Sequence, residues 1–147
     1  MIITRIWDYR LLPYLPDAQL RGQWRECALI AYGLQKNGTP NHLLVNIVTK
    51  YSYDEFATYC KMVEQEMFNR GFNTTIESQE KIYFKAWNYI HERPIFEGWH
   101  DKEYLRICMA NLTEKYAYGV GTSRIGINDW LRLCEGYRLI TGEDYEI

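Results

Sequence analysis

Apolar residues recur every three or four positions in several stretches of the chain, the spacing that places side chains on one face of a helix. The clearest stretch follows Asp17, a suitable N-cap, and runs from about Ala18 to Tyr32 before glycine, asparagine and proline interrupt it. Its apolar positions form one stripe: Leu20, Trp24, Cys27, Ala28 and Ala31. Upstream, the two prolines in residues 11–16 predict an extended approach to this helix.

Similar signals predict the later helices. Ser52 and Glu55 form a capping-box pattern, which marks the start of a second helix. That helix should end near Asn69, where the Arg70–Gly71 pair closes it because glycine can take the left-handed conformation. The remaining helices are expected over residues 77–90, 102–113 (capped by Asp101) and 130–139.

The segment 42–50 is a short apolar run that fits either a buried strand or a helical piece, and its length does not decide between them. The expected fold is therefore all-α: a single compact domain, residues 1–147, of four to five helices around one core, with one short strand if 42–50 is extended. Thirteen Tyr and five Trp favour a packed core first, with a partner surface or base stacking as alternatives.

The net charge of the chain limits which classes of function are plausible, in particular nucleic-acid binding. With a formal net charge of −2, the chain lacks the basic excess of a dedicated nucleic-acid binder, so a DNA-binding role requires a local basic patch. The first thirty residues offer four arginines for such a patch: Arg5, Arg10, Arg21 and Arg25. Acidic residues gather later, at 64–66, 77–80 and 143–146.

The cysteines are widely spaced and lie among apolar residues, which predicts buried reduced thiols in place of a zinc site. They are Cys27, Cys60, Cys108 and Cys134. No metal or cofactor is expected. The chain shows no signal peptide, bilayer-spanning run or lipidation motif, so we expect a cytoplasmic location and no membrane partner.

The strongest chemical pattern lies on the first predicted helix, where Arg21 and Arg25 flank Glu26. A carboxylate beside guanidinium groups is expected to stay ionised, and it can act as a base or stabilise a developing cation. The arginines can hold an anionic substrate, which suggests chemistry at a phosphate backbone. The alternative is a salt-bridged, solvated helix surface.

Three parts of the sequence together form a recognisable pattern. The first is the series Leu12-Pro13-Tyr14-Leu15-Pro16, Gln19-Leu20 and Gly22-Gln23-Trp24-Arg25-Glu26-Cys27. The second is the helix from Tyr53 with its closing turn at residues 69–73, and the third is residues 93–106. These parts resemble the pyrimidine-dimer DNA glycosylase (endonuclease V) family, especially its bacterial and phage relatives. The resemblance covers roughly residues 3–113, and it leaves the last thirty residues without a counterpart.

The resemblance implies an all-helical DNA repair enzyme that grips damaged double-stranded DNA. In this family, the N-terminal α-amine attacks the sugar carbon of the damaged nucleotide, displaces the base and forms a Schiff base, after which β-elimination nicks the strand. Glu26 matches the assisting glutamate and Thr4 the leading threonine, so both are expected to be catalytic. The expected substrate-binding residues are Arg5, Arg10, Arg21, Arg25, Gln19 and Gln23.

The sequence departs from the family pattern at several positions. Residues 1–3 precede Thr4, Leu29 stands where the family has a phosphate-binding arginine, and Gln19 replaces a histidine. These departures and the acidic balance keep a second hypothesis open, a catalytically inactive homologue that binds DNA or a protein partner, as a phage effector would. An enzyme acting on a small molecule or nucleotide is supported only by the aromatic content.

Overall fold

The computed structural model describes residues 6–37, 48, 50–83 and 94–146. Five α-helices and short 3₁₀ segments occur in these ranges, and no strand does, which confirms the all-α expectation. The main elements are η1 (Tyr9–Tyr14), α1 (Asp17–Asn37), α2 (Tyr53–Asn69), α3 (Ile76–Tyr83), α4 (Lys102–Tyr118), η3 (Gly121–Ser123) and α5 (Ile127–Thr141).

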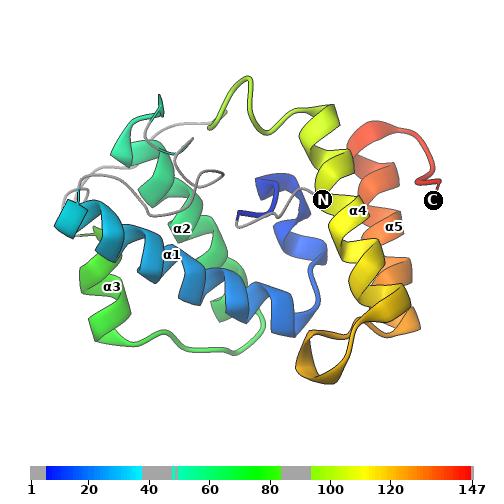
Figure 1. The fold of residues 1–147 in the computed structure, drawn as a ribbon, viewed down its shortest axis with the longest axis horizontal. Helices are drawn as coiled ribbons and strands as arrows, with labels where there is room; N and C mark the ends of the chain where they lie inside the picture. The colour runs from blue at the N-terminus through cyan, green and yellow to red at the C-terminus, as the bar shows by residue number, and fades with distance from the viewer. Residues whose placement is uncertain (1–5, 38–47, 49, 84–93, 147) are drawn as a thin grey trace.

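The helices form two groups (Figure 1). α1 packs against α2 and α3 in one group, while α4 and α5 lie side by side in the other. The short helix η1 contacts both α2 and α5, so it lies between the groups. Because Ile6, Trp7 and Asp8 are buried, the first described residues lie within the centre of the molecule.

Local capping explains where two of the helices begin. Ser52 accepts the Glu55 N–H at 3.2 Å, and the Glu55 carboxylate accepts the Ser52 N–H at 3.4 Å, so the predicted capping box is confirmed. Asp101 accepts the Tyr104 N–H at 2.9 Å and caps α4, also as predicted. Gly142, with a φ of 77°, ends α5 in the left-handed conformation.

The expectation of an extended segment at residues 11–16 is wrong, because most of it belongs to η1. The Asp8 carboxylate accepts the Arg10 N–H at 3.0 Å and starts the turn, and the Leu15 N–H closes it on the Leu11 carbonyl at 3.1 Å. The fixed proline φ of about −65° suits a 3₁₀ turn as well as an extended chain. The prolines alone therefore do not distinguish the two conformations.

Helix ends also differ from the prediction. α1 begins at Asp17 itself and continues to Asn37, with Gly33 inside it, since one glycine costs a helix only about 1 kcal/mol. Asp17 is the first residue of the helix and therefore not the expected N-cap, and its carboxylate pairs with Arg70 at 2.9 Å. α4 and α5 are likewise longer than predicted. Residues 84–90 of the third predicted helix lie outside the described residues, as do residues 42–47 and 49 of the apolar run 42–50.

Many of the aromatic side chains lie in the core, the placement that the sequence analysis favoured. Buried aromatic residues include Trp7, Trp24, Phe56, Tyr59, Tyr83, Phe96, Trp99, Trp130 and Tyr137. The cysteines are unpaired, and all except the half-buried Cys134 are buried, which agrees with the prediction of free thiols. No helix in the described ranges is long and apolar enough to cross a bilayer.

Gly136 sets the distance between α5 and η1. A Cβ at this position would lie 2.4 Å from the Tyr14 ring, so Gly136→Ala forces the two elements apart. We expect the substitution to lower the free energy of unfolding by about 1–3 kcal/mol, measured by urea denaturation. The matched control is Gly22→Ala in α1, where the nearest atom is 3.6 Å away and alanine should stabilise the helix by about 0.5–1 kcal/mol. Equal effects at the two positions would contradict this packing argument.

Candidate nucleic-acid interface

The predicted Glu26 block lies along a groove of about 880 Å³ between α1 and the segment that joins α4 to α5. We call it the Glu26 groove. Its α1 side consists of Asp17, Ala18, Gln19, Arg21, Gly22, Gln23, Arg25, Glu26 and Leu29. Its other lining residues are Trp7, Lys115, Thr122 and Ser123. Arg21 and Arg25 are exposed, whereas Glu26 is half-buried.

Two buried glutamines link α1 to the rest of the groove. Gln19 donates from Nε2 to the Ser123 carbonyl at 2.8 Å, which joins α1 to η3. Its Oε1 is buried and makes no hydrogen bond with the described residues. Gln23 accepts the Trp7 N–H at 2.8 Å through its own Oε1. The groove is therefore held together by hydrogen bonds between segments that are far apart in the sequence.

A second hollow of about 560 Å³ lies on the other side of the two arginines, between α1 and α3. Its apolar lining includes Trp24 and Met67, and Lys81 contributes a further positive charge. Arg21 and Arg25 line both spaces, and the Arg21 guanidinium lies 5.0 Å from the centre of the Phe72 ring. The arginines thus form a basic ridge between two concave surfaces, an arrangement that suits a phosphate backbone.

The charges along these two spaces favour an anionic ligand. The basic lining residues are Arg21, Arg25, Lys81 and Lys115, and the acidic ones are Asp17 and Glu26. Asp17 is paired with Arg70 and Lys81 with Glu77, so Arg21, Arg25 and Lys115 outnumber Glu26 among the other charged lining residues. A local basic patch therefore exists in a chain whose net charge is −2.

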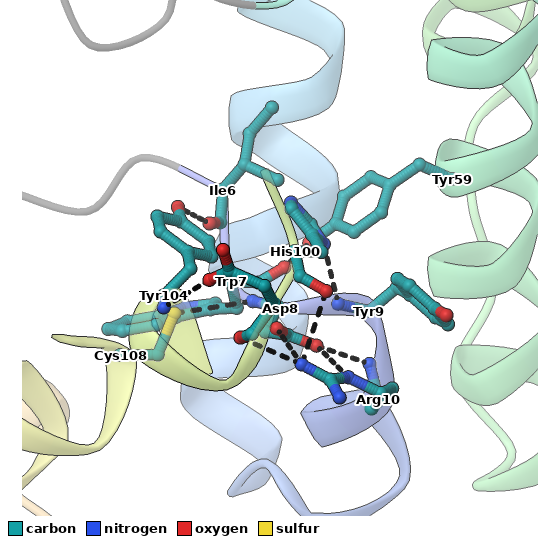
Figure 2. A network of polar contacts seen from close by, with 10 residues as sticks. Ile6, Trp7, Asp8, Tyr9, Arg10, Tyr59, His100, Tyr104 and Cys108 are labelled. Carbon is teal, nitrogen blue, oxygen red and sulfur yellow. Dashed lines mark hydrogen bonds and ion pairs between the residues drawn. The ribbon is translucent and has the colours of Figure 1, made fainter. Parts of the chain in front are cut away.

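Arg10, predicted to bind substrate, belongs to a buried network outside the lining of both spaces (Figure 2). Its guanidinium pairs with the buried Asp8 carboxylate at 2.9 Å and donates to the backbone carbonyls of His100 and Asp101. The hydrogen bond to Asp8 raises the pKa of Arg10. These contacts tie the start of η1 to the start of α4.

His100 lies at the centre of this network, stacked between Tyr9 and Tyr104. Its Nδ1 accepts the Tyr9 N–H at 3.1 Å, so Nδ1 carries no proton and the ring is neutral. Burial, assisted by the nearby charge of Arg10, lowers the pKa of His100 to about 3. The His100 ring is thus a structural acceptor for the backbone of η1.

Protonation of His100 should make the fold sensitive to acid. The unfolded chain binds this proton near pH 6.5, whereas the folded chain binds it only near pH 3. The neutral His100 ring therefore contributes its full share to the free energy of unfolding above pH 6.5, and this contribution decreases as the pH falls from 6.5 toward 3. We expect the free energy of unfolding to drop by about 1.4 kcal/mol per pH unit from this group. Urea denaturation between pH 7 and about pH 5, where carboxylates stay ionised, measures the slope. His100→Gln should flatten it, and an unchanged slope in that variant would contradict the assignment.

The structure brings most of the predicted site residues together and adds others. Glu26, Arg21, Arg25, Gln19 and Gln23 line one groove. Thr4 and Arg5 lie outside the described residues. Sequence reasoning missed Trp7, Lys81, Lys115, Thr122 and Ser123, which carry no motif and reach the site only through the fold. In the described part of the chain, no three potential ligands gather to hold a metal ion.

The described part of the chain is helical, and a glutamate shares its groove with two arginines that can bind an anionic backbone. Residues 4–80 match the family model described as pyrimidine dimer DNA glycosylase, and this match covers more than half of the chain. The chain therefore belongs to the pyrimidine dimer DNA glycosylase family, whose substrate class is DNA. Comparison with curated proteins and with solved structures gave no match.

Proposed function

We propose that this protein is an active DNA glycosylase and AP lyase that acts on damaged duplex DNA through its N-terminal α-amine, with Glu26 as the assisting carboxylate. One observation carries the proposal: Glu26 shares a groove with Arg21, Arg25 and Trp7. Trp7 belongs to the opening of the chain, so the segment that leads back to the α-amine starts at the same groove as the carboxylate. The basic ridge accounts for DNA binding at the rim.

The chemistry suits these groups. An α-amine has a pKa near 8, well below that of lysine, so an appreciable fraction is nucleophilic at neutral pH. Its nitrogen attacks the C1′ carbon of the damaged nucleotide, and the N-glycosidic bond breaks with its electron pair leaving on the base. Loss of a proton and opening of the sugar ring give the imine. Removal of a C2′ proton then expels the 3′ phosphate, which nicks the strand. In this proposal, Glu26 stabilises positive charge on the sugar and moves these protons.

Arg21 and Arg25 hold phosphates in this proposal, and Gln19 and Gln23 line the groove beneath them. Leu29, which is 60% exposed beside the ridge, offers an apolar surface to a sugar or base. Thr4 and Arg5 remain catalytic and substrate-binding candidates from the family pattern. Because a damaged base pairs poorly, moving it out of the duplex costs less than moving an intact one.

Reduction with borohydride tests the proposal directly. Full-length protein, with its first residue identified by intact mass, is incubated with duplexes that contain an abasic site or a pyrimidine dimer, and the imine is trapped by reduction. We expect a covalent protein–DNA adduct that is lost when the α-amine is acetylated. An absence of adduct on both duplexes overturns the proposal. Retardation of lesion-free DNA without any adduct would instead identify a DNA-binding homologue without catalysis.

A further inference from the structure

Three residues line both the Glu26 groove and the hollow between α1 and α3: Arg21, Arg25 and Leu29. They follow one another at intervals of four residues on α1, so each lies about 6 Å further along the helix axis than the one before. Leu29 therefore extends the basic ridge by one turn and ends it with an apolar side chain. α1 contacts both α3 and η3, which places this ridge between the two spaces (Figure 1).

The Leu29 side chain, 60% exposed, is continuous with further apolar surface. The apolar side chains that line the hollow beside it are Trp24, Ala28, Tyr32 and Met67. The ammonium groups of Lys36 and Lys81 lie 4.9 and 5.5 Å from the centre of the Tyr32 ring, so positive charge borders this surface. Single exposed leucines are ordinary in soluble proteins, whereas an apolar patch rimmed by charge marks a binding surface.

The helix that carries Leu29 is fixed to its neighbours. Trp24 donates from Nε1 to Ser78 Oγ of α3 at 3.1 Å, and the Arg21 guanidinium lies 5.0 Å from the centre of the Phe72 ring. Leu29 thus projects from a well-anchored helix between two concave spaces of about 880 and 560 Å³. A side chain that parts stacked bases needs this combination, because its backbone must not yield and the parted bases need room on either side.

Charge and shape together select the partner of this ridge. The two guanidinium groups match phosphates along one strand, and the apolar side chain at the end of the row matches the faces of stacked bases. An acidic peptide also matches the arginines, but it would fill one of the two spaces, whereas a duplex whose bases are parted occupies both.

We propose that Leu29 is a wedge that enters the base stack beside the damaged nucleotide while Arg21 and Arg25 hold phosphates next to it. This inference deepens the proposed function and rests on it, because that function makes damaged duplex DNA the ligand of the Glu26 groove. An inserted apolar side chain replaces stacking contacts that are lost when a nucleotide leaves the duplex. The arginine of the family pattern at this position would instead add a phosphate contact.

Fluorescence of a modified duplex tests the wedge without any reaction. The duplex carries tetrahydrofuran in place of one nucleotide and 2-aminopurine, which brightens when it unstacks, as the neighbouring base. Tetrahydrofuran has neither a base nor a hydroxyl group at C1′, so no imine forms. We expect saturating wild-type protein to raise the fluorescence by about threefold, and Leu29→Ala to lose at least about half of this rise. The matched control is Leu139→Ala, which truncates a leucine that is 59% exposed on α5, outside both linings, and should keep the wild-type signal.

Leu29→Arg separates insertion from surface contact. The added guanidinium should tighten binding to undamaged duplex and steepen the slope of log affinity against log salt concentration by about 0.9. The fluorescence rise should nevertheless fall as in Leu29→Ala, because a charged side chain enters an apolar stack at a high cost. Wild-type fluorescence in Leu29→Ala and Leu29→Arg overturns the wedge. Failure of the wild-type protein to bind the duplex also overturns it, since the ridge then has another partner.

This experiment and the borohydride experiment distinguish the two proposals. A wild-type adduct, combined with equal fluorescence in Leu29→Ala and Leu139→Ala, overturns the wedge and leaves the glycosylase proposal standing. A fluorescence loss confined to the Leu29 variants, without any adduct, supports the wedge and overturns the glycosylase proposal. Absence of both results overturns both.

Discussion

Glu26→Gln is expected to lower the rate of adduct formation on abasic duplex by about 100- to 1,000-fold, the usual contribution of a positioned acid or base. Glutamine keeps the size of the side chain but has neither the negative charge nor the basicity of glutamate. Glu26 is half-buried and lines the same groove as Arg21 and Arg25, and the proposed function assigns it the role of assisting carboxylate. Single-turnover kinetics with borohydride trapping measure the effect.

The affinity of Glu26→Gln for duplex DNA should change much less than its rate of adduct formation. Removing a negative charge from a basic groove should leave the affinity for duplex DNA unchanged or slightly higher, because phosphate contacts dominate that affinity. The matched control is Glu103→Gln, which neutralises an exposed carboxylate on α4 outside the groove lining and should keep the wild-type rate. If Glu26→Gln forms the adduct as fast as Glu103→Gln, Glu26 has no part in the reaction.

Arg70→Met is expected to lower the free energy of unfolding by about 3 kcal/mol, because one side chain supplies several hydrogen bonds from a charged donor. Its guanidinium donates to the carbonyls of Leu15 at 2.6 Å, Pro13 at 3.2 Å and Leu12 at 3.3 Å. It also pairs with carboxylates on α1 and α2 at 2.9 Å. Arg70 therefore fastens the end of η1 and the start of α1 to the end of α2.

Urea denaturation of the variant checks this expectation. Methionine fills similar space but removes the donor to the Leu12 and Leu15 carbonyls, while the Pro13 carbonyl keeps its hydrogen bond from Arg132 at 2.7 Å. Arg70→Lys keeps the charge and should retain part of the stability. The matched control is Arg138→Met, which breaks an exposed pair with Glu135 on α5 and should change the stability little. Similar losses in Arg70→Met and Arg138→Met would show that the contacts of Arg70 do not stabilise the fold.

The sequence was sufficient to predict features that depend on residues a few positions apart in the chain. Ser52 with Glu55 and Asp101 with Tyr104 are contacts between residues three apart, so their pattern identifies helix starts without knowledge of the fold. The stripe on α1 likewise predicted that Leu20 and Trp24 face the core. Glu26 and its arginines were identified as a candidate site because their spacing on one helix is also local.

The sequence was insufficient where a residue acts over a long separation. The sequence marks Arg70 only as the end of a helix, yet Arg70 bonds to carbonyls more than fifty residues earlier. The sequence predicts that Arg10 binds substrate, but the fold pairs its guanidinium with the buried Asp8 carboxylate. Lys115 and Ser123 line the groove about ninety residues after Glu26, and no pattern in the chain connects them with it.

The bond between Gln19 and Ser123 has a consequence for how this protein can diverge. It joins the family-matched part of the chain, residues 4–80, to a turn that lies outside the match. One wall of the groove is thus encoded separately from Glu26 and the two arginines. Exchange of residues 115–123 between homologues would reshape the mouth of the groove without changing Glu26, Arg21 or Arg25, and under the proposed function this offers a route to new lesion preferences by recombination.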